Sequence, residues 1–211
     1  MQAFTAYAAA TAVTVALMIE SERRGSVAVW ALKPVASMGF ILAAVTAGAT
    51  GSAFGVAVLV GLALSWWGDV LLLSRERWPF LAGLGAFLLA HVAYAVAFLI
   101  RGVDWAYAFS ALALLAPVAA LIGRGLDGSV PAPMRVPVRV YTAVITVMVA
   151  LAVGTAGERG GWWIVAGAVM FYLSDLSVAL DRFVSPGWKN KLWGWPLYYG
   201  AQLVLAWCAG R

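Results

Sequence analysis

The sequence predicts an all-α membrane protein whose helices cross the bilayer several times, and two observations support that fold class. Of the 211 residues, 64% are hydrophobic and only 11% are charged, whereas a soluble domain usually carries about 25% charged residues. The apolar residues also form runs close to the roughly 20 residues that one helix needs to span a bilayer. A water-soluble exterior cannot be built from this composition. We therefore expect a single transmembrane domain over residues 1–211, organised as a polytopic helical bundle.

Eight apolar runs predict about eight transmembrane helices. They cover residues 3–19, 27–47, 52–73, 79–100, 103–123, 137–153, 161–181 and 192–209. Charged residues, prolines and glycines mark the breaks between the runs. The break at 124–137 contains three prolines and is predicted to be the longest loop. The first run has no basic segment before it, so we interpret it as a retained helix and not as a cleaved signal peptide.

The Lys and Arg residues predict the orientation of the chain. Ten of the fourteen flank the breaks after the first, third, fifth and seventh runs, and three lie on the opposite side. The ten are Arg23, Arg24, Arg75, Arg77, Arg124, Arg135, Arg139, Arg182, Lys189 and Lys191. Basic loops of multi-pass proteins stay in the cytoplasm, so both termini are predicted outside, in a cell inner membrane. Topology and lipid head groups account for the net charge of +5, so we expect no nucleic-acid partner. The sequence indicates no oligomeric state.

A weak internal repeat links the third and seventh runs. The third run contains Trp67-Gly68-Asp69 and the seventh contains Leu173-Ser174-Asp175. Each aspartate lies near the predicted cytoplasmic end of its helix and precedes a basic loop. With four helices per half, a repeat of this kind would give two parallel four-helix halves.

Charged and titratable side chains inside the apolar runs are the candidates for function. They are Lys33, Asp69, His91 and Asp175, with Asp181 closer to the membrane interface. An ionisable group at the centre of a transmembrane helix costs about 2.5–3.5 kcal/mol on insertion scales. Groups of this kind mark functional sites more often than those on a soluble surface.

The depth of these residues in the membrane follows from their distance to the basic loops. Lys33, Asp69, Asp175 and Tyr198 each lie six to nine residues from a loop Lys or Arg, or roughly 9–14 Å along a helix axis. His91 lies deeper. Because the four residues come from four different helices and share one level, we expect a polar pocket that opens toward the cytoplasmic leaflet.

The two aspartates admit two interpretations. Lys33 can neutralise one of them in a buried ion pair that serves only helix packing. Alternatively, two neighbouring carboxylates favour a state in which one is protonated and the other is ionised. That state suits general acid and general base catalysis, so Asp69 and Asp175 are the candidate catalytic pair.

Further polar groups lie in the fourth and eighth runs. His91 and Tyr94 are three residues apart on one helix face, and Tyr198, Tyr199 and Gln202 share the last run. These groups need hydrogen-bond partners inside a bilayer. Bonds between helices and contacts with a substrate both meet that need, and the sequence leaves both open. With one cysteine and one histidine in the chain, neither a disulfide nor a zinc site is expected.

Five stretches from the second to the eighth run resemble the lysoplasmalogenase family, whose bacterial members are known as YhhN-like proteins. They are Leu32-Lys33-Pro34, 67–73 (WGDVLLL), 83–98 (GLGAFLLAHVAYAVAF), 172–183 and 198–202 (YYGAQ). Their order and spacing carry the resemblance, since no single stretch is specific. The first run and the 124–137 loop carry no such signature. Leu176-Ser177 replaces a more apolar stretch of the family, which is a mild departure.

The resemblance implies hydrolysis of the vinyl ether bond in lysoplasmalogens, which gives a fatty aldehyde and glycerophosphoethanolamine or glycerophosphocholine. It implies that Asp69 and Asp175 act as the acid and base, as paired carboxylates do in glycosidases, and that no cofactor is required. Membrane lipids and a lysophospholipid substrate are then the partners. The implied substrate-binding residues are Lys33, His91, Tyr94, Tyr198, Tyr199 and Gln202.

A proton-coupled transporter of a small solute is the alternative function, because membrane carboxylates and a histidine also relay protons. Strongly kinked or broken helices in both halves would favour it. A membrane scaffold without catalysis is a third interpretation, in which the aspartates serve folding alone.

Overall fold

The computed structural model describes residues 1–74 and 76–211, and over these residues the chain is helical, without a strand. Arg75, one of the ten basic residues used to predict orientation, lies outside the described residues. The helices are α1 (Gln2–Arg23), α2 (Val29–Ala47), α3 (Ala53–Leu71), α4 (Arg77–Arg101), α5 (Trp105–Leu126), α6 (Ala132–Arg159), α7 (Trp163–Ala179) and α8 (Trp188–Cys208). A 3₁₀ turn, η1 (Ala49–Gly51), precedes α3, and a π-helical turn, η2 (Leu180–Val184), extends α7. The predicted all-α fold class is confirmed.

Seven helices in the described part of the chain are long and apolar enough to cross a membrane, namely α1 to α6 and α7 together with η2. They make this an integral membrane protein. The predicted eighth span corresponds to α8, which has 21 residues but is not among these seven helices. Its first turns carry Lys189 and Lys191, and its middle buries Tyr198, Tyr199 and Gln202. These polar residues suit a helix enclosed by other helices better than one facing lipid.

The connection between α5 and α6 is shorter than expected. The sequence predicted a loop at 124–137, but α5 runs to Leu126 and α6 already begins at Ala132. Pro131 is the residue that caps α6, and Pro133 lies in its first turn. A proline in the first turn disturbs little, because the N–H groups there have no partner within the helix. The prolines therefore start a helix here, where the sequence analysis took them as a sign of an extended loop.

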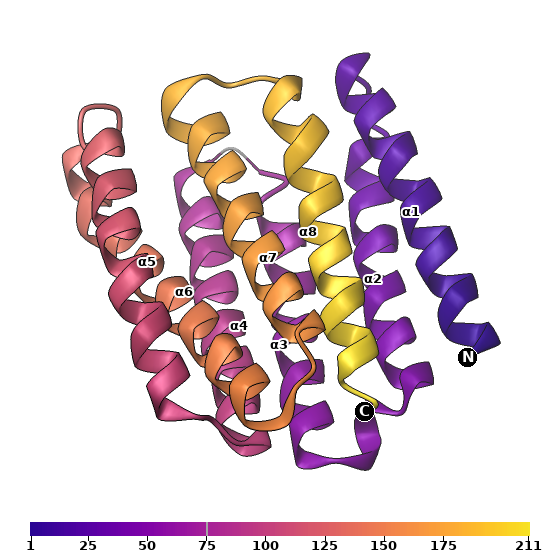
Figure 1. Cartoon of the computed structure of the whole chain (residues 1–211). Coiled ribbons are helices and arrows are strands. Elements are labelled where there is room, and N and C mark those ends of the chain that lie inside the picture. The colour runs from indigo at the N-terminus through magenta and orange to yellow at the C-terminus, as the bar shows by residue number, and fades with distance from the viewer. Residues whose placement is uncertain (75) are drawn as a thin grey trace.

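Six helices form a closed ring, in which each contacts the next in the order α2, α3, α4, α6, α7, α8 and back to α2. In addition, α3 contacts α8 across the ring, α1 packs on α2 and α8, and α5 packs on α6. Figure 1 shows the helices side by side, with both termini at the same end of the bundle. We call the opposite end, where α1 joins α2, α3 joins α4, α5 joins α6 and α7 joins α8, the basic end.

The helix contacts of the two halves correspond to one another. Contacts of α1 with α2, α2 with α3, and α3 with α4 are matched by α5 with α6, α6 with α7, and α7 with α8. The halves are joined by the equivalent contacts of α2 with α8 and of α6 with α4, but α8 also packs on α1 and α3 and α4 has no comparable contact with α5 or α7 in the described residues. The packing is therefore that of two parallel four-helix halves only in part.

Two glycines let α3 and α4 approach closely beside the ring's interior. A Cβ atom on Gly61 would lie 2.5 Å from the Tyr94 ring, and one on Gly68 would lie 2.6 Å from the Phe87 ring. Such separations are shorter than van der Waals contact, so only glycine fits at either position. The close approach brings the α3 backbone next to Asp69 against the aromatic face of α4.

Candidate active site

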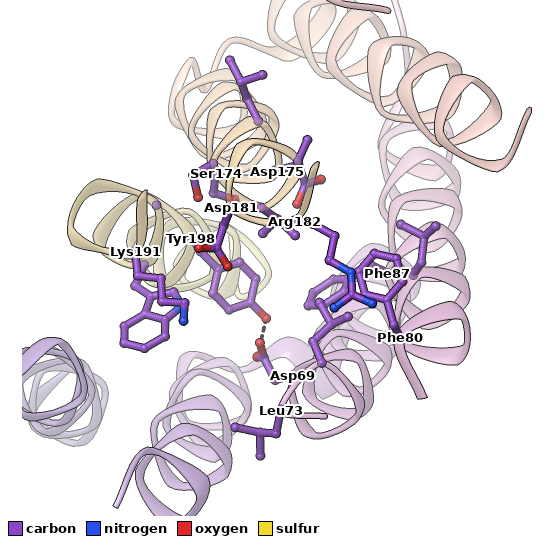
Figure 2. Close-up of a pocket in the computed structure, with 18 of the residues that line it drawn as sticks. Asp69, Leu73, Phe80, Phe87, Ser174, Asp175, Asp181, Arg182, Lys191 and Tyr198 are labelled. Atoms are coloured by element: carbon purple, nitrogen blue, oxygen red, sulfur yellow. Dashed lines mark hydrogen bonds between the residues drawn. The ribbon is translucent and has the colours of Figure 1, made fainter. Parts of the chain in front are cut away.

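A cavity of about 680 Å³ opens at the basic end of the bundle. Its volume is within the usual range of small-molecule sites. Asp69, Asp175, Lys33 and Tyr198 all line it. Figure 2 shows Asp69 on α3 and Asp175 on α7 facing this cavity from different sides. The four residues that the sequence analysis assigned to one level therefore share one cavity.

Asp69 forms the first carboxylate centre. It is 1% exposed, and its Oδ1 lies 3.1 Å from Nζ of Lys33. Its Oδ2 accepts hydrogen bonds of 2.6 Å from both Ser37 Oγ and Tyr198 Oη. Three donors, one of them a cation, thus surround the carboxylate. Each oxygen of this buried carboxyl group is therefore paired, as burial of a polar group requires.

A second layer of bonds holds the groups around Asp69. Tyr199 Oη lies 3.0 Å from Ser37 Oγ and donates to it, because the single hydroxyl hydrogen of Ser37 goes to Asp69. The Lys33 carbonyl lies 3.4 Å from the same tyrosine oxygen. On the other side, Trp66 Nε1 donates to the Pro34 carbonyl at 3.1 Å. These contacts connect α2 to α8 and to α3 next to Lys33. They therefore hold the backbone of Lys33 in place.

Asp175 forms the second carboxylate centre. Its side chain is 17% exposed, and its Oδ2 lies 3.4 Å from Nε2 of His91. The same oxygen accepts a 2.8 Å hydrogen bond from Tyr141 Oη. The His91 ring is fully buried, with ring-centre distances of 4.6 Å to Phe171 and 5.2 Å to Tyr141. Asp175 is therefore more open to the cavity than Asp69, and a histidine lies beside it where Asp69 has a lysine.

The two centres correspond under exchange of the two halves of the chain. Asp175 follows Asp69 by 106 positions, Tyr141 follows Lys33 by 108, and Tyr198 follows His91 by 107. In each centre the aspartate is contacted from both halves: Asp69 by Lys33 and Ser37 of its own half and by one residue of the other, and Asp175 by one residue of each. Tyr198 of α8 reaches Asp69, and His91 of α4 reaches Asp175.

The remaining predicted site residues lie behind the cavity wall. Tyr94 donates a 2.7 Å hydrogen bond to Gln202 Oε1, and both side chains are fully buried. Neither of them is among the cavity-lining residues, and the same holds for Tyr199 and His91. The structure shows contacts between helices for all four, and substrate contact by them stays a prediction. Asp181, in η2, does line the cavity, and its Oδ1 accepts a 2.8 Å bond from the Gly187 amide.

The sequence analysis missed Ser37 and Tyr141, which bond directly to the two aspartates. Ser37 lies four residues after Lys33, on the same helix face, and this spacing was a usable signal. Tyr141 lies near the start of the predicted run 137–153. That run was interpreted only as a membrane span, without a functional residue. The offset between the aspartates, applied to Lys33, leads to Tyr141 within two positions.

Over residues 1–74 and 76–211, no three His, Cys, Asp or Glu side chains gather as a metal-binding group. Chemistry without a cofactor stays a prediction, and the side chains themselves supply the acids, bases and cations discussed below.

Comparison with known proteins agrees with the resemblance that the motifs indicate. The YhhN family model matches residues 28–209. The chain is 30% identical to "Lysoplasmalogenase TMEM86A" of Bos taurus over 155 residues, and 31% identical to the Homo sapiens protein of the same name. Each match covers 71% of this chain and 63% of the relative, so the chain matches less than two thirds of those proteins' length. No solved structure matches the chain. The chain belongs to the YhhN family.

Proposed function

We propose that the chain is a membrane lipid hydrolase that cleaves the vinyl ether bond of lysoplasmalogens. The two curated relatives carry the name of that activity. The observation that carries the proposal here is the facing pair, Asp69 and Asp175, in one cavity at the end of a membrane bundle. Paired carboxylates are the groups that break acetal-type bonds through an oxocarbenium ion in glycosidases.

The cavity wall suits a lipid with one chain and one polar head. Apolar side chains from three helices line one part of it, namely Leu84 and Phe87 of α4, Ile122 of α5, and Val138 and Ile145 of α6. Carboxylates, a lysine and a tyrosine line the floor. An alkenyl chain would lie against the apolar wall and leave its vinyl ether beside the aspartates.

The reaction needs a proton delivered to carbon. A carboxylic acid protonates the vinyl carbon that is not bonded to oxygen, and the other vinyl carbon becomes an oxocarbenium ion. Water then adds to that carbon and gives up a proton to the second carboxylate. The resulting hemiacetal collapses to a fatty aldehyde and a glycerol hydroxyl, with one water molecule consumed in total. General acid or base catalysis of such steps contributes typically 10²–10⁴-fold each.

The environments of the two aspartates support a division of roles. Asp69 pairs with Lys33 and accepts hydrogen bonds from two hydroxyl donors, which are partners that complement a carboxylate. We assign it to stabilising the cation and activating water. Asp175 lies beside His91 and Tyr141 and is the more exposed of the two side chains, so it is assigned to proton delivery. In this assignment Lys33 pairs with Asp69, and cations nearer the cavity mouth bind the phosphate.

Purified protein in lipid nanodiscs tests the proposal. We expect release of fatty aldehyde, detected by mass spectrometry, from an alkenyl lysophosphatidylethanolamine, and none from the ester lysolipid of equal chain length. Asp69→Asn and Asp175→Asn should each lower the rate by at least about a hundredfold. Full activity in both variants, or no aldehyde from the unmodified protein, would contradict the proposal.

The bond that is broken can be identified separately. In water labelled with ¹⁸O, cleavage on the vinyl side leaves the glycerol hydroxyl oxygen unlabelled, because the water adds to the vinyl carbon. Label in the glycerophosphoethanolamine would show cleavage on the glycerol side and would exclude the oxocarbenium route.

A transporter would instead move an intact solute in proteoliposome counterflow, without any chemical change.

A further inference from the structure

An ion pair crosses the mouth of the cavity and has no part in the chemistry above. Lys191 of α8 bonds through Nζ to a carboxylate oxygen of Glu22 on α1. Both residues line the cavity, and their side chains are only 19% and 21% exposed. Lys191 Nζ also lies 5.9 Å from the centre of the Trp195 ring. A half-buried pair of this kind is costly to desolvate unless it has further favourable contacts.

The pair lies at the right height above the aspartates to meet a head group. Lys191 precedes Tyr198 by seven residues on α8, which is about 10 Å along the helix axis. The hydroxyl of Tyr198 bonds to Asp69 on the cavity floor, as Figure 2 shows together with Lys191 at the side of the same opening. In a lysoplasmalogen, the glycerol backbone and the phosphate separate the vinyl ether from the terminal amine. A lipid with its vinyl ether on the floor would therefore bring its head group to this level.

Charges of both signs line the mouth. Besides Glu22 and Lys191, the lining includes Asp181 and Arg182 of η2, and the Arg182 guanidinium lies 4.1 Å from the Phe80 ring centre. A ligand with phosphate alone would be attracted by the two cations and repelled by the two acids. A ligand with an amine alone would be attracted by the two acids and repelled by the two cations. A phosphate joined to an ammonium group through two carbons matches both signs at once.

We propose, building on the proposed function, that Glu22 and Lys191 recognise a zwitterionic phosphoamine head group. Lys191 binds the phosphate, and Glu22 binds the ammonium. The ligand therefore separates the two side chains and replaces their ion pair with one ion pair to each of them. Glu22 lies before residue 28, where the match to the family model begins. The amine-binding half of the site is thus supplied by α1, outside the region this chain shares with the family model.

Binding of non-hydrolysable lipids tests this proposal apart from catalysis. We would titrate the protein in nanodiscs with two 1-O-alkyl lysolipids of equal chain length, one with phosphoethanolamine and one with phosphoglycerol. The ethanolamine lipid should bind about tenfold more tightly, as expected for one charge-assisted hydrogen bond. Glu22→Gln should remove that preference by weakening the ethanolamine lipid alone. Lys191→Gln should weaken both lipids by a similar factor.

The double variant E22K/K191E separates recognition from a structural role. It rebuilds the ion pair with reversed polarity, so a purely structural pair would restore the original preference. Under the proposal the preference stays lost, because the charges meet the phosphate and the amine in the wrong order. Asp127→Asn, which removes the acid of the Arg139 ion pair at the same end of the bundle, is the matched control and should change neither affinity.

Besides a restored preference in E22K/K191E, two results would overturn the proposal. One is equal binding of both lipids by the unmodified protein. The other is an unchanged preference in Glu22→Gln. Neither depends on turnover, so failure of head-group recognition is distinguishable from failure of the proposed hydrolysis.

Discussion

Tyr198 donates a 2.6 Å hydrogen bond from α8 to Oδ2 of Asp69 on α3. This contact joins the two chain halves at the cavity floor. It supplies a hydrogen bond to one oxygen of a carboxylate that is almost fully buried. Removing the hydroxyl therefore takes a donor from a charged buried group, which costs more than the loss of an ordinary surface hydrogen bond.

We expect Tyr198→Phe to lower the rate of aldehyde release by about tenfold to a hundredfold, because one charge-assisted bond to Asp69 is worth about 1.5–3 kcal/mol. Single-turnover rates on saturating lipid would measure the effect. Tyr107→Phe on the exposed side of α5 is the control and should keep the original rate. A full rate in Tyr198→Phe would mean that Asp69 does not depend on this donor.

Tyr141→Phe should slow the same reaction through the other carboxylate. Its hydroxyl donates to Asp175 at 2.8 Å, and loss of that bond frees the side chain to turn away from the cavity. The expected sign is a lower kcat with little change in KM, because Asp175 is assigned to proton delivery and not to binding. A changed KM with constant kcat would instead assign Tyr141 to substrate contact.

Lys33→Met should destabilise the fold by about 3 kcal/mol, because removing one partner of a buried ion pair leaves the other charge uncompensated. The double variant K33M/D69N should recover most of that loss, since it no longer buries a lone carboxylate. Both should be inactive. Unfolding in mixed detergent micelles with increasing dodecyl sulfate gives the free energies. Equal stability of the single and double variants would show that Lys33 does not neutralise Asp69.

Gly68→Ala should lower stability by about 1–3 kcal/mol, the usual cost of overpacking, because the new Cβ would meet the Phe87 ring. Gly85→Ala is the matched change on the facing helix, where a Cβ meets nothing within 4 Å. It should be neutral or slightly stabilising, since alanine has the higher helix propensity. The same unfolding assay compares the two, and a reversed order would argue against the close approach of α3 and α4.

The orientation of the chain in the membrane is predicted from its basic residues and is open to direct measurement. Reporter fusions at the C-terminus and in the connection between α5 and α6 should report opposite sides, with the connection in the cytoplasm. Fusion to a phosphatase that is active only outside the cytoplasm, and to a fluorescent protein that is active only inside, gives complementary signals. The reverse pattern would move the cavity mouth to the outer face.

Depth in the membrane was predictable from the sequence, because the rise of a helix is constant and basic residues mark one face of the bilayer. That argument brought Lys33, Asp69, Asp175 and Tyr198 to one level, and all four line one cavity. Rotation of each helix about its axis was not predictable. In a bilayer the outer face of a helix is as apolar as the inner face, so periodicity does not reveal which residues point inward.

The missed and displaced features have different causes. That Ser37 and Tyr141 bond to the aspartates depends on how the helices are rotated, although their spacing from Lys33 was a usable signal. The start of α6 was misjudged because Pro131 and Pro133 occur equally in loops and in first helical turns. The internal offset between the two aspartates was present in the sequence and leads from Lys33 to within two positions of Tyr141.

Tyr198 and His91 each contact the aspartate of the opposite half, which has a consequence for how such a bundle could have arisen. A four-helix half standing alone holds an aspartate but lacks the residue that reaches it from the opposite half. Two copies of an ancestral half would have had to associate before either carboxylate was complete, so activity would have required a dimer from the outset. Fusion of the two genes would then have fixed that partnership in one chain and freed each aspartate to take a separate task.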